Sequence, residues 1–207
     1  MKFRLAIFDF DGTLADSFPF FVGVFNQLAE RHGFRKIDPD SAPSFRGASP
    51  REMMDHVGLP AWKLPFVARD FISLMRENAA SIKPFEGINE VLQHLVKEGV
   101  TLAVVSSNSY DNVSAVLSPE SARLISHFEC GMSIFGKSVR IAKTLHKTAI
   151  PGSEAIYIGD QVTDLAASRK AGVAFGAVSW GYATIESLRN HSPEEEFDCV
   201  SALKKIA

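Results

Sequence analysis

The chain has 207 residues, a net charge of −2 and 46% hydrophobic residues, so roughly 70% of its surface can be buried around one substantial core. The near-neutral charge argues against a protein dedicated to binding nucleic acid or a membrane surface, and no apolar run approaches the roughly 20 residues of a membrane helix. Cys130 and Cys199 form neither a disulfide framework nor a metal-site spacing, which favours a reducing, cytoplasmic location.

The first predicted element is a strand over residues 3–8, which is apolar throughout and ends just before Asp9. The pattern then changes, and from about residue 15 to 80 we expect helices and no strand. One helical stripe contains Phe18, Phe21, Val22, Phe25, Leu28 and Ala29. A second contains Leu64, Val67, Ala68, Phe71, Leu74 and Met75. Between them, Ser49-Pro50-Arg51-Glu52 predicts a capped helix start.

After residue 81, helices and strands alternate. Helices are predicted over residues 88–96, 137–148 and 163–171, and strands over residues 100–105, 155–158 and 173–178, with a weaker strand at 129–134. The strands are almost continuously apolar, which is typical of a parallel sheet covered by helices on both faces. We expect Glu194-Glu195-Glu196 to be a solvated loop. The predicted fold is therefore α/β, with a core of residues 1–14 and 81–207 and an inserted all-helical cap at residues 15–80.

Two carboxylates end the first strand, in the run Asp9-Phe-Asp11-Gly12-Thr13. Residues two apart in a strand point to the same side, and ligands bind at the carboxyl ends of central strands in open α/β sheets. Such a pair can also simply cap a loop. Two like charges at this distance repel, so we expect a metal ion or a shared proton between them.

A second apolar strand ends in Gly159-Asp160, and Asp164 follows at the start of a helix. Asp164 has an ordinary explanation, because acidic residues complement the dipole at a helix N-terminus. Carboxylates that converge from two strand ends are costly unless a hard divalent cation binds them. The pattern therefore predicts a Mg²⁺ site.

Two weaker signals lie between these motifs: Ser106-Ser107-Asn108 ends the strand over 100–105, and Lys137 precedes a helix. Serine and asparagine are common at strand ends, and a lone lysine is usually a solvated charge. Their order along the chain gives them weight, since each of the four motifs lies beside a predicted strand terminus.

In these four motifs the chain resembles the haloacid dehalogenase superfamily, in its phosphoglycolate-phosphatase-like branch with a helical cap. The resemblance covers about residues 3–180 and implies a Rossmann-like core. It implies that Asp9 is a nucleophile that forms an aspartyl-phosphate and that Asp11 is the general acid and base. It further implies that Asp9, Asp11, Asp160 and Asp164 hold Mg²⁺, that Ser106 binds a phosphoryl oxygen and that Lys137 neutralises the phosphate.

Further positions are expected to bind substrate: Gly12, Thr13, Ser107 and Asn108 near the phosphate, and Arg46 and Arg51 from the cap. A solvated surface role is an equally good explanation for each arginine. We favour Ser106 over Ser107 as the side chain that contacts phosphate. The expected substrate is a small phosphate ester, phosphoglycolate-like or a sugar phosphate, and the protein is expected to be a monomer or homodimer.

Other activities on the same scaffold are weighed against this prediction. The second aspartate of the first motif disfavours a dehalogenase, and neither cap lysine, Lys36 or Lys63, is marked as the activated lysine that a phosphonate hydrolase needs. A sugar-phosphate mutase would use the same aspartyl-phosphate. A non-catalytic binding protein has no evident need to keep the set Asp9, Asp11, Lys137 and Asp160, since fold alone does not give function.

Overall fold

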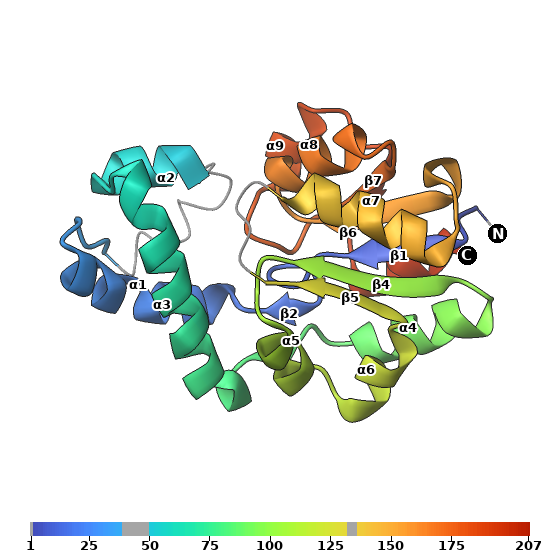
Figure 1. Cartoon of the computed structure of the whole chain (residues 1–207), viewed down its shortest axis with the longest axis horizontal. Helices are drawn as coiled ribbons and strands as arrows, with labels where there is room; N and C mark the ends of the chain where they lie inside the picture. Colours follow the sequence, from blue (N-terminus) through green and yellow to red (C-terminus); the bar gives the residue numbers. More distant parts are fainter. Residues whose placement is uncertain (1, 39–49, 132–135) are drawn as a thin grey trace.

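The computed structural model describes residues 2–38, 50–131 and 136–207. Within these ranges, six parallel strands form one sheet in the order β5-β4-β1-β6-β7-β8 (Figure 1). In that spatial order the strands are His127–Cys130, Thr101–Ser106, Leu5–Phe8, Ala155–Gly159, Ala174–Val178 and Glu195–Phe197. β1 pairs with β4 on one side and with β6 on the other. The first strand of the chain is therefore central in the sheet.

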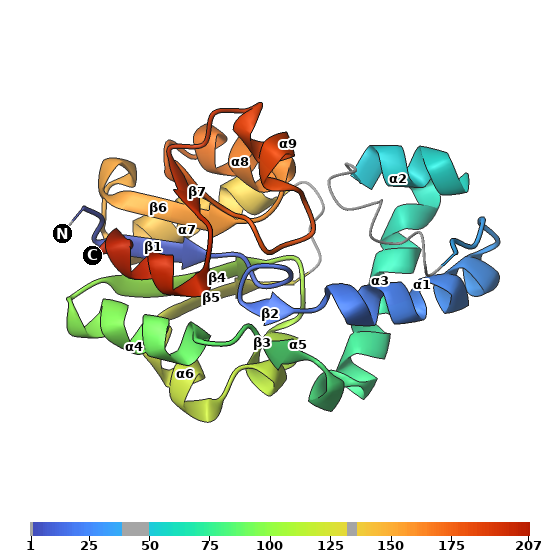
Figure 2. The same ribbon diagram turned by 180° about the vertical axis from the view of Figure 1, so that it is seen from behind.

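Helices cover both faces of the sheet, as its almost continuously apolar strands require. Successive strand residues point to opposite faces, so Ala6 and Phe8 belong to one buried cluster and Leu5 and Ile7 to another. The first cluster is covered by α4 (Ile88–Lys97), α5 (Tyr110–Val116), α6 (Pro119–Leu124) and η5 (Val200–Ile206). The second is covered by α7 (Lys137–Thr148), α8 (Val162–Lys170) and α9 (Ile185–Arg189). Figure 2 shows the two layers from behind.

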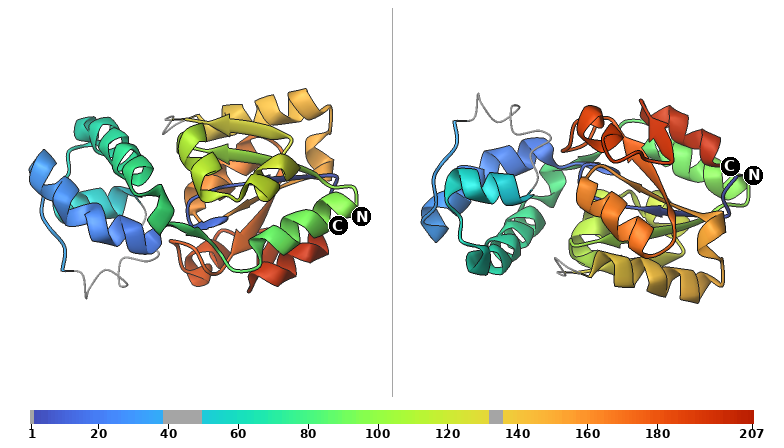
Figure 3. Two further views of the ribbon diagram at one scale, coloured as in Figure 1. Left: turned by 90° about the horizontal axis from the view of Figure 1, so that it is seen from below. Right: turned by 90° about the horizontal axis from the view of Figure 1, so that it is seen from above.

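A helical unit lies beside this domain, at the end of the sheet toward which β1 runs (Figures 1 and 3). It consists of α1 (Phe18–His32), α2 (Pro50–Val57), η2 (Ala61–Lys63), α3 (Leu64–Glu77) and η3 (Ala79–Ser81). The unit has its own buried cluster, built on Phe25, Ile37, Val57 and Leu59. None of the helices in the described ranges combines the length and apolar character needed to cross a lipid bilayer.

The chain enters the helical unit through β2 (Ala15–Asp16) and leaves it through β3 (Lys83–Pro84), and these two short strands pair antiparallel. The prediction of no strand within residues 15–80 is therefore wrong at Ala15 and Asp16. Two residues are too few to show an alternating pattern, and their partners lie far along the chain. The paired strands bring the two connections of the helical unit together.

The strands predicted over 3–8, 100–105, 155–158 and 173–178 are confirmed with small shifts at their ends. The weaker prediction over 129–134 corresponds to β5, although residues 132–134 lie outside the described residues. The loop predicted at Glu194–Glu196 is wrong, because Glu195–Phe197 forms the edge strand β8. An edge strand tolerates charged side chains: Glu196 pairs with the exposed Arg189, while Phe197 is buried.

Candidate active site

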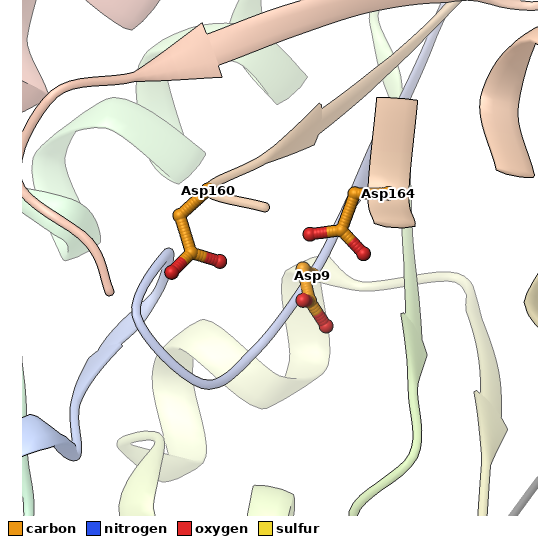
Figure 4. A group of neighbouring side chains, drawn as sticks. All are labelled: Asp9, Asp160 and Asp164. Atoms are coloured by element: carbon orange, nitrogen blue, oxygen red, sulfur yellow. The ribbon is translucent and has the colours of Figure 1, made fainter. Parts of the chain in front are cut away.

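Three buried carboxylates meet at the carboxyl end of the sheet (Figure 4). Asp9 directly follows β1, Asp160 directly follows β6, and Asp164 lies in the first turn of α8. Because β1 and β6 are parallel neighbours, the residues after them emerge at the same end of the sheet. One carboxylate oxygen from each aspartate lies within 4.8 Å of the other two. The structure therefore brings these three predicted metal ligands together.

Lys137, the first residue of α7, places its ammonium group beside two of these carboxylates. Its Nζ lies 2.9 Å from Oδ2 of Asp9 and 2.5 Å from Oδ1 of Asp164. Burial disfavours the charged amine, but the negative charges of Asp164 and Asp9 raise the pKa of Lys137 well above its ordinary value. Lys137 is therefore a fixed positive charge next to Asp9.

One positive charge does not balance three carboxylates. Burial, together with the charges of Asp164 and Asp160, raises the pKa of Asp9 well above its ordinary value, although Lys137 acts in the opposite direction. Burial and the charge of Asp164 raise the pKa of Asp160 to about 7. A divalent cation with oxygen ligands would relieve this repulsion. The donor set of Asp9, Asp160 and Asp164 therefore fits Mg²⁺.

The carboxylate of Asp160 is enclosed by backbone at positions where a side chain would not fit. A Cβ on Gly12 would lie 2.3 Å from Oδ2 of Asp160, and a Cβ on Gly181 would lie 2.2 Å from its Cβ. The Thr13 hydroxyl donates a 3.4 Å hydrogen bond to Oδ1 of Asp160. Gly12 and Thr13, predicted to bind substrate, thus hold Asp160 in place, and their contact with a substrate stays a prediction.

Asp11 lies outside the three-aspartate cluster. Its Oδ2 accepts a 2.9 Å hydrogen bond from Nδ2 of Asn108, whereas its buried Oδ1 has no partner among the described residues. Burial raises the pKa of Asp11, and the hydrogen bond from Asn108 lowers it. The same Nδ2 lies 2.8 Å from Sδ of Met75 on α3. Asp11 is therefore a carboxyl group with a raised pKa at the junction of the sheet and the helical unit.

The segment Ser106-Ser107-Asn108 ends β4, next to β1. The buried Ser106 accepts a 3.0 Å hydrogen bond from the Asn108 amide through its Oγ, so its hydroxyl hydrogen is not used in that bond. Ser107 is exposed and lines a cavity between the sheet domain and the helical unit. The two serines therefore face different surroundings, and the preference for Ser106 as a phosphate ligand stays a prediction.

Tyr182 is a site residue that the sequence analysis did not identify. Its amide donates a 2.6 Å hydrogen bond to Oδ2 of Asp160, and its hydroxyl lies 3.0 Å from Oγ of Ser17. Its ring packs edge-on against Phe18, with 5.1 Å between the ring centres. A signal was available, because the segment that follows the strand predicted over 173–178 must emerge at the same end of the sheet as Asp9.

A cavity of about 410 Å³ lies between the sheet domain and the helical unit. On the sheet side it is lined by Asp11, Ser107, Gln161, Val162, Thr163, Tyr182 and Ala183. Arg51, predicted to contact substrate, is exposed at the start of α2 and is not among the residues that line this cavity. Arg46 lies outside the described residues.

Most of the chain is similar in sequence to a known protein family and to several phosphatases. The family model described as haloacid dehalogenase-like hydrolase matches residues 6–178. A phosphoglycolate phosphatase from Synechococcus elongatus is 29% identical over 91% of this chain and 89% of its own. A phosphoglycolate phosphatase from Agrobacterium fabrum is 30% identical over 96% of this chain and 90% of its own. An N-acetylmuramic acid 6-phosphate phosphatase from Pseudomonas aeruginosa is 23% identical over 88% of this chain and 84% of its own.

Solved structures show the same fold. A haloacid dehalogenase-like hydrolase from Streptococcus pneumoniae superposes with a TM-score of 0.80 at 18% identity, covering 98% of this chain and 97% of its own. CbbY from Rhodobacter sphaeroides, solved in complex with phosphate, superposes with a TM-score of 0.69 at 20% identity, covering 97% of this chain and 96% of its own.

Proposed function

Because the chain belongs to the haloacid dehalogenase-like hydrolases, we propose that it is a Mg²⁺-dependent phosphatase that hydrolyses a small phosphate monoester through an aspartyl-phosphate on Asp9. The observation that carries the proposal is the position of Asp9. It lies at the end of the central strand, 2.9 Å from the ammonium of Lys137 and beside the carboxylates of Asp160 and Asp164. The phosphatases among the relatives support the same reaction class.

In the proposed reaction, an oxygen of Asp9 attacks phosphorus while the bond between phosphorus and the leaving oxygen breaks. Asp11 donates its proton to that leaving oxygen, and the raised pKa of Asp11 supports this role. Water then attacks the phosphorus of the aspartyl-phosphate while Asp11 takes a proton from this water. The bond between phosphorus and the Asp9 oxygen breaks, which releases phosphate and restores the Asp9 carboxylate.

Asp9, Asp160 and Asp164 would hold the Mg²⁺, together with the main-chain carbonyl of Asp11. When bound, the cation supplies positive charge to the phosphoryl oxygens. Lys137, the first residue of α7, supplies a second positive charge. Such a charge matters because phosphoryl transfer depends mostly on positioning and electrostatic stabilisation. The hydroxyl of Ser106 donates to a phosphoryl oxygen, because the bond that its Oγ accepts from the backbone N–H of Asn108 does not use the hydroxyl hydrogen.

The helical unit acts as the cap over this site. Its α3 contacts the site directly, through Met75 on Asn108 and through the Ile72 carbonyl, which accepts a 2.9 Å hydrogen bond from Asn112. A cap of this kind excludes bulk water and so limits side reactions of the phosphorylated enzyme.

The test is phosphate release from a panel of small monoesters, in Mg²⁺ and in chelator, by the wild type and by Asp9→Asn. We expect release that requires both Mg²⁺ and Asp9. Asp55→Asn is the matched control, because it makes the same substitution at an exposed residue of α2. This variant should retain activity. Release by Asp9→Asn at the wild-type rate would remove the nucleophile assignment. Transfer of phosphate between sugar hydroxyls without release would show a mutase instead.

A further inference from the structure

The cavity beside Asp11 has two chemically different walls. The side chains that line it from the described part of the helical unit are all apolar, and they include Phe21 of α1, Met53 of α2, and Val67 and Phe71 of α3. Among the described residues around the whole cavity, Asp11 is the one with a carboxyl or basic side chain, and a carboxyl group is never a cation. The described lining therefore offers aromatic and aliphatic surface and no cation.

The aromatic part of this wall is packed before any ligand binds. The ring centre of Phe21 lies 5.4 Å from that of Phe25, 5.9 Å from that of Phe71 and 5.9 Å from that of Tyr182. These tilted and edge-to-face contacts are the preferred arrangements of aromatic pairs. They connect the helical unit to the sheet domain, so the apolar surface and the catalytic residues belong to one continuous site.

The leaving group of the substrate is the part that enters this cavity. Asp11, as the proposed acid, must reach the oxygen that joins phosphorus to the leaving group, and Asp11 itself lines the cavity. Whatever is attached to that oxygen then lies between Asp11 and the rings of Phe21 and Phe71. A volume of about 410 Å³ is within the range of small-molecule sites, roughly 300–1,000 Å³.

The charge of the cavity decides which leaving groups fit. A carboxylate, such as the one in phosphoglycolate, would lose its hydration here without gaining a positive partner from the described lining, and it would lie near the carboxyl group of Asp11. An apolar group would instead remove both itself and the aromatic surface from water. A polyol would find hydrogen-bonding side chains on the sheet side of the cavity, but none among the lining residues of the described part of the helical unit.

We propose that the substrate is a phosphate monoester of an uncharged, apolar alcohol, aromatic or alkyl, whose carbon skeleton packs against the aromatic wall of the helical unit. This inference rests on the phosphatase function proposed above and adds to it the class of leaving group.

The experiment compares kcat/KM for benzyl phosphate and butyl phosphate with kcat/KM for phosphoglycolate and glycerol 3-phosphate. All four have alkoxide leaving groups, which limits differences in intrinsic reactivity. We expect the apolar esters to be preferred by at least about tenfold, as is usual when a pocket matches an apolar group.

Cavity variants test whether this preference comes from the proposed wall. Ala68→Lys places a cation on α3 in the cavity, and Ala68→Met adds comparable bulk without charge. We expect Ala68→Lys to shift the ratio of benzyl phosphate to phosphoglycolate by at least about tenfold toward phosphoglycolate, and Ala68→Met to keep the apolar preference. Thr163→Lys, at an exposed position on α8 that also lines the cavity, repeats the test if Ala68→Lys does not fold. Ala61→Lys, exposed and outside the cavity lining, is the control for added charge.

The outcomes separate this inference from the function on which it rests. Mg²⁺-dependent hydrolysis with phosphoglycolate equal to or better than benzyl phosphate would overturn the inference and leave the phosphatase standing. An apolar preference that Ala68→Lys and Thr163→Lys leave unchanged would also overturn the assignment of the cavity. If the folded wild type releases phosphate from none of the esters, the proposed function fails and the inference falls with it.

Discussion

The ammonium of Lys137 lies 2.9 Å from Oδ2 of Asp9, although 128 residues separate them in the chain. The contact joins the N-terminus of α7 to the end of β1, and Lys137 simultaneously contacts Asp164 on α8. The central strand β1 and two helices that cover the sheet, α7 and α8, are thus connected through one partly buried ammonium group. This arrangement keeps Asp9 close to a positive charge before any ligand binds.

Replacing Lys137 by methionine is expected to lower both activity and stability. The buried carboxylates of Asp9 and Asp164 would lose their partner, a change that typically costs about 3–5 kcal/mol of unfolding free energy. Loss of one charge-stabilising donor typically lowers kcat about 10²–10³-fold. Urea unfolding in chelator and steady-state kinetics in Mg²⁺ measure the two effects. Lys170→Met, at an exposed position near the end of α8, is the matched control, and a loss of activity below about tenfold in Lys137→Met would show that another cation holds the phosphate.

Asp160→Asn is expected to change stability in opposite directions with and without Mg²⁺. In chelator the variant should be at least as stable as the wild type, because one of three mutually repelling buried carboxylates has been neutralised. In Mg²⁺ the wild type should gain about 2.7 kcal/mol at a concentration 100 times the dissociation constant, and the variant should gain much less. Thermal unfolding in both conditions, at matched ionic strength, measures the reversal. Equal stabilisation of the two proteins by Mg²⁺ would remove Asp160 from the metal site.

Gly12→Ala is expected to destabilise the protein by about 2–5 kcal/mol, the sum of a left-handed backbone penalty and a steric conflict. The residue has a φ of +76°, and the new Cβ would lie 2.3 Å from Oδ2 of Asp160. Gly99→Ala separates the two effects, because Gly99 has a φ of +85° but no atom within 4 Å of the added Cβ. We expect Gly99→Ala to cost about 1–2 kcal/mol and to leave activity intact. Similar unfolding free energies for the two variants would contradict the steric role of Asp160.

Glu129→Gln is expected to destabilise the protein at neutral pH and not at low pH. Burial favours the neutral acid, but hydrogen bonds from Lys147 and Lys143, at 2.7 and 2.9 Å, hold the pKa of Glu129 below its ordinary value of 4.5. A carboxyl group with a lowered folded-state pKa stabilises the protein above its unfolded pKa, and this contribution disappears as the pH falls through the folded pKa.

The measurement for Glu129 is the unfolding free energy of the wild type and Glu129→Gln between pH 7 and pH 3. The difference should be about 1 kcal/mol at pH 7, since both lysines are partly exposed, and should shrink below pH 4.5. Glu98→Gln, at an exposed position after α4, should show no such dependence. A difference that stays unchanged between pH 7 and pH 3 would show that the effect is not electrostatic.

Local patterns in the sequence determined the elements of the core and the residue types of the site. The apolar runs before Asp9 and Asp160 indicate strands that are buried on both faces. Such a run can be recognised from residues that are neighbours along the chain. The same holds for α7, whose predicted bounds, residues 137–148, agree with Lys137–Thr148. The carboxylates at the ends of two strands could be found because a strand end is itself a local feature.

Contacts between residues far apart in the chain were decided by the tertiary structure alone, through the order of the strands and the packing of the helical unit. Tyr182 reaches Asp160 because β7 lies next to β6, and Glu195–Phe197 is a strand because an edge position next to β7 was free to pair. Phe21 and Phe71 belong to two different helical stripes, each of which indicates a core. Only the packing of α1 and α3 beside the sheet domain places both in the lining of the cavity that Asp11 also lines. Periodicity shows that a side chain is shielded from water, but which atoms shield it depends on contacts between residues far apart in the chain.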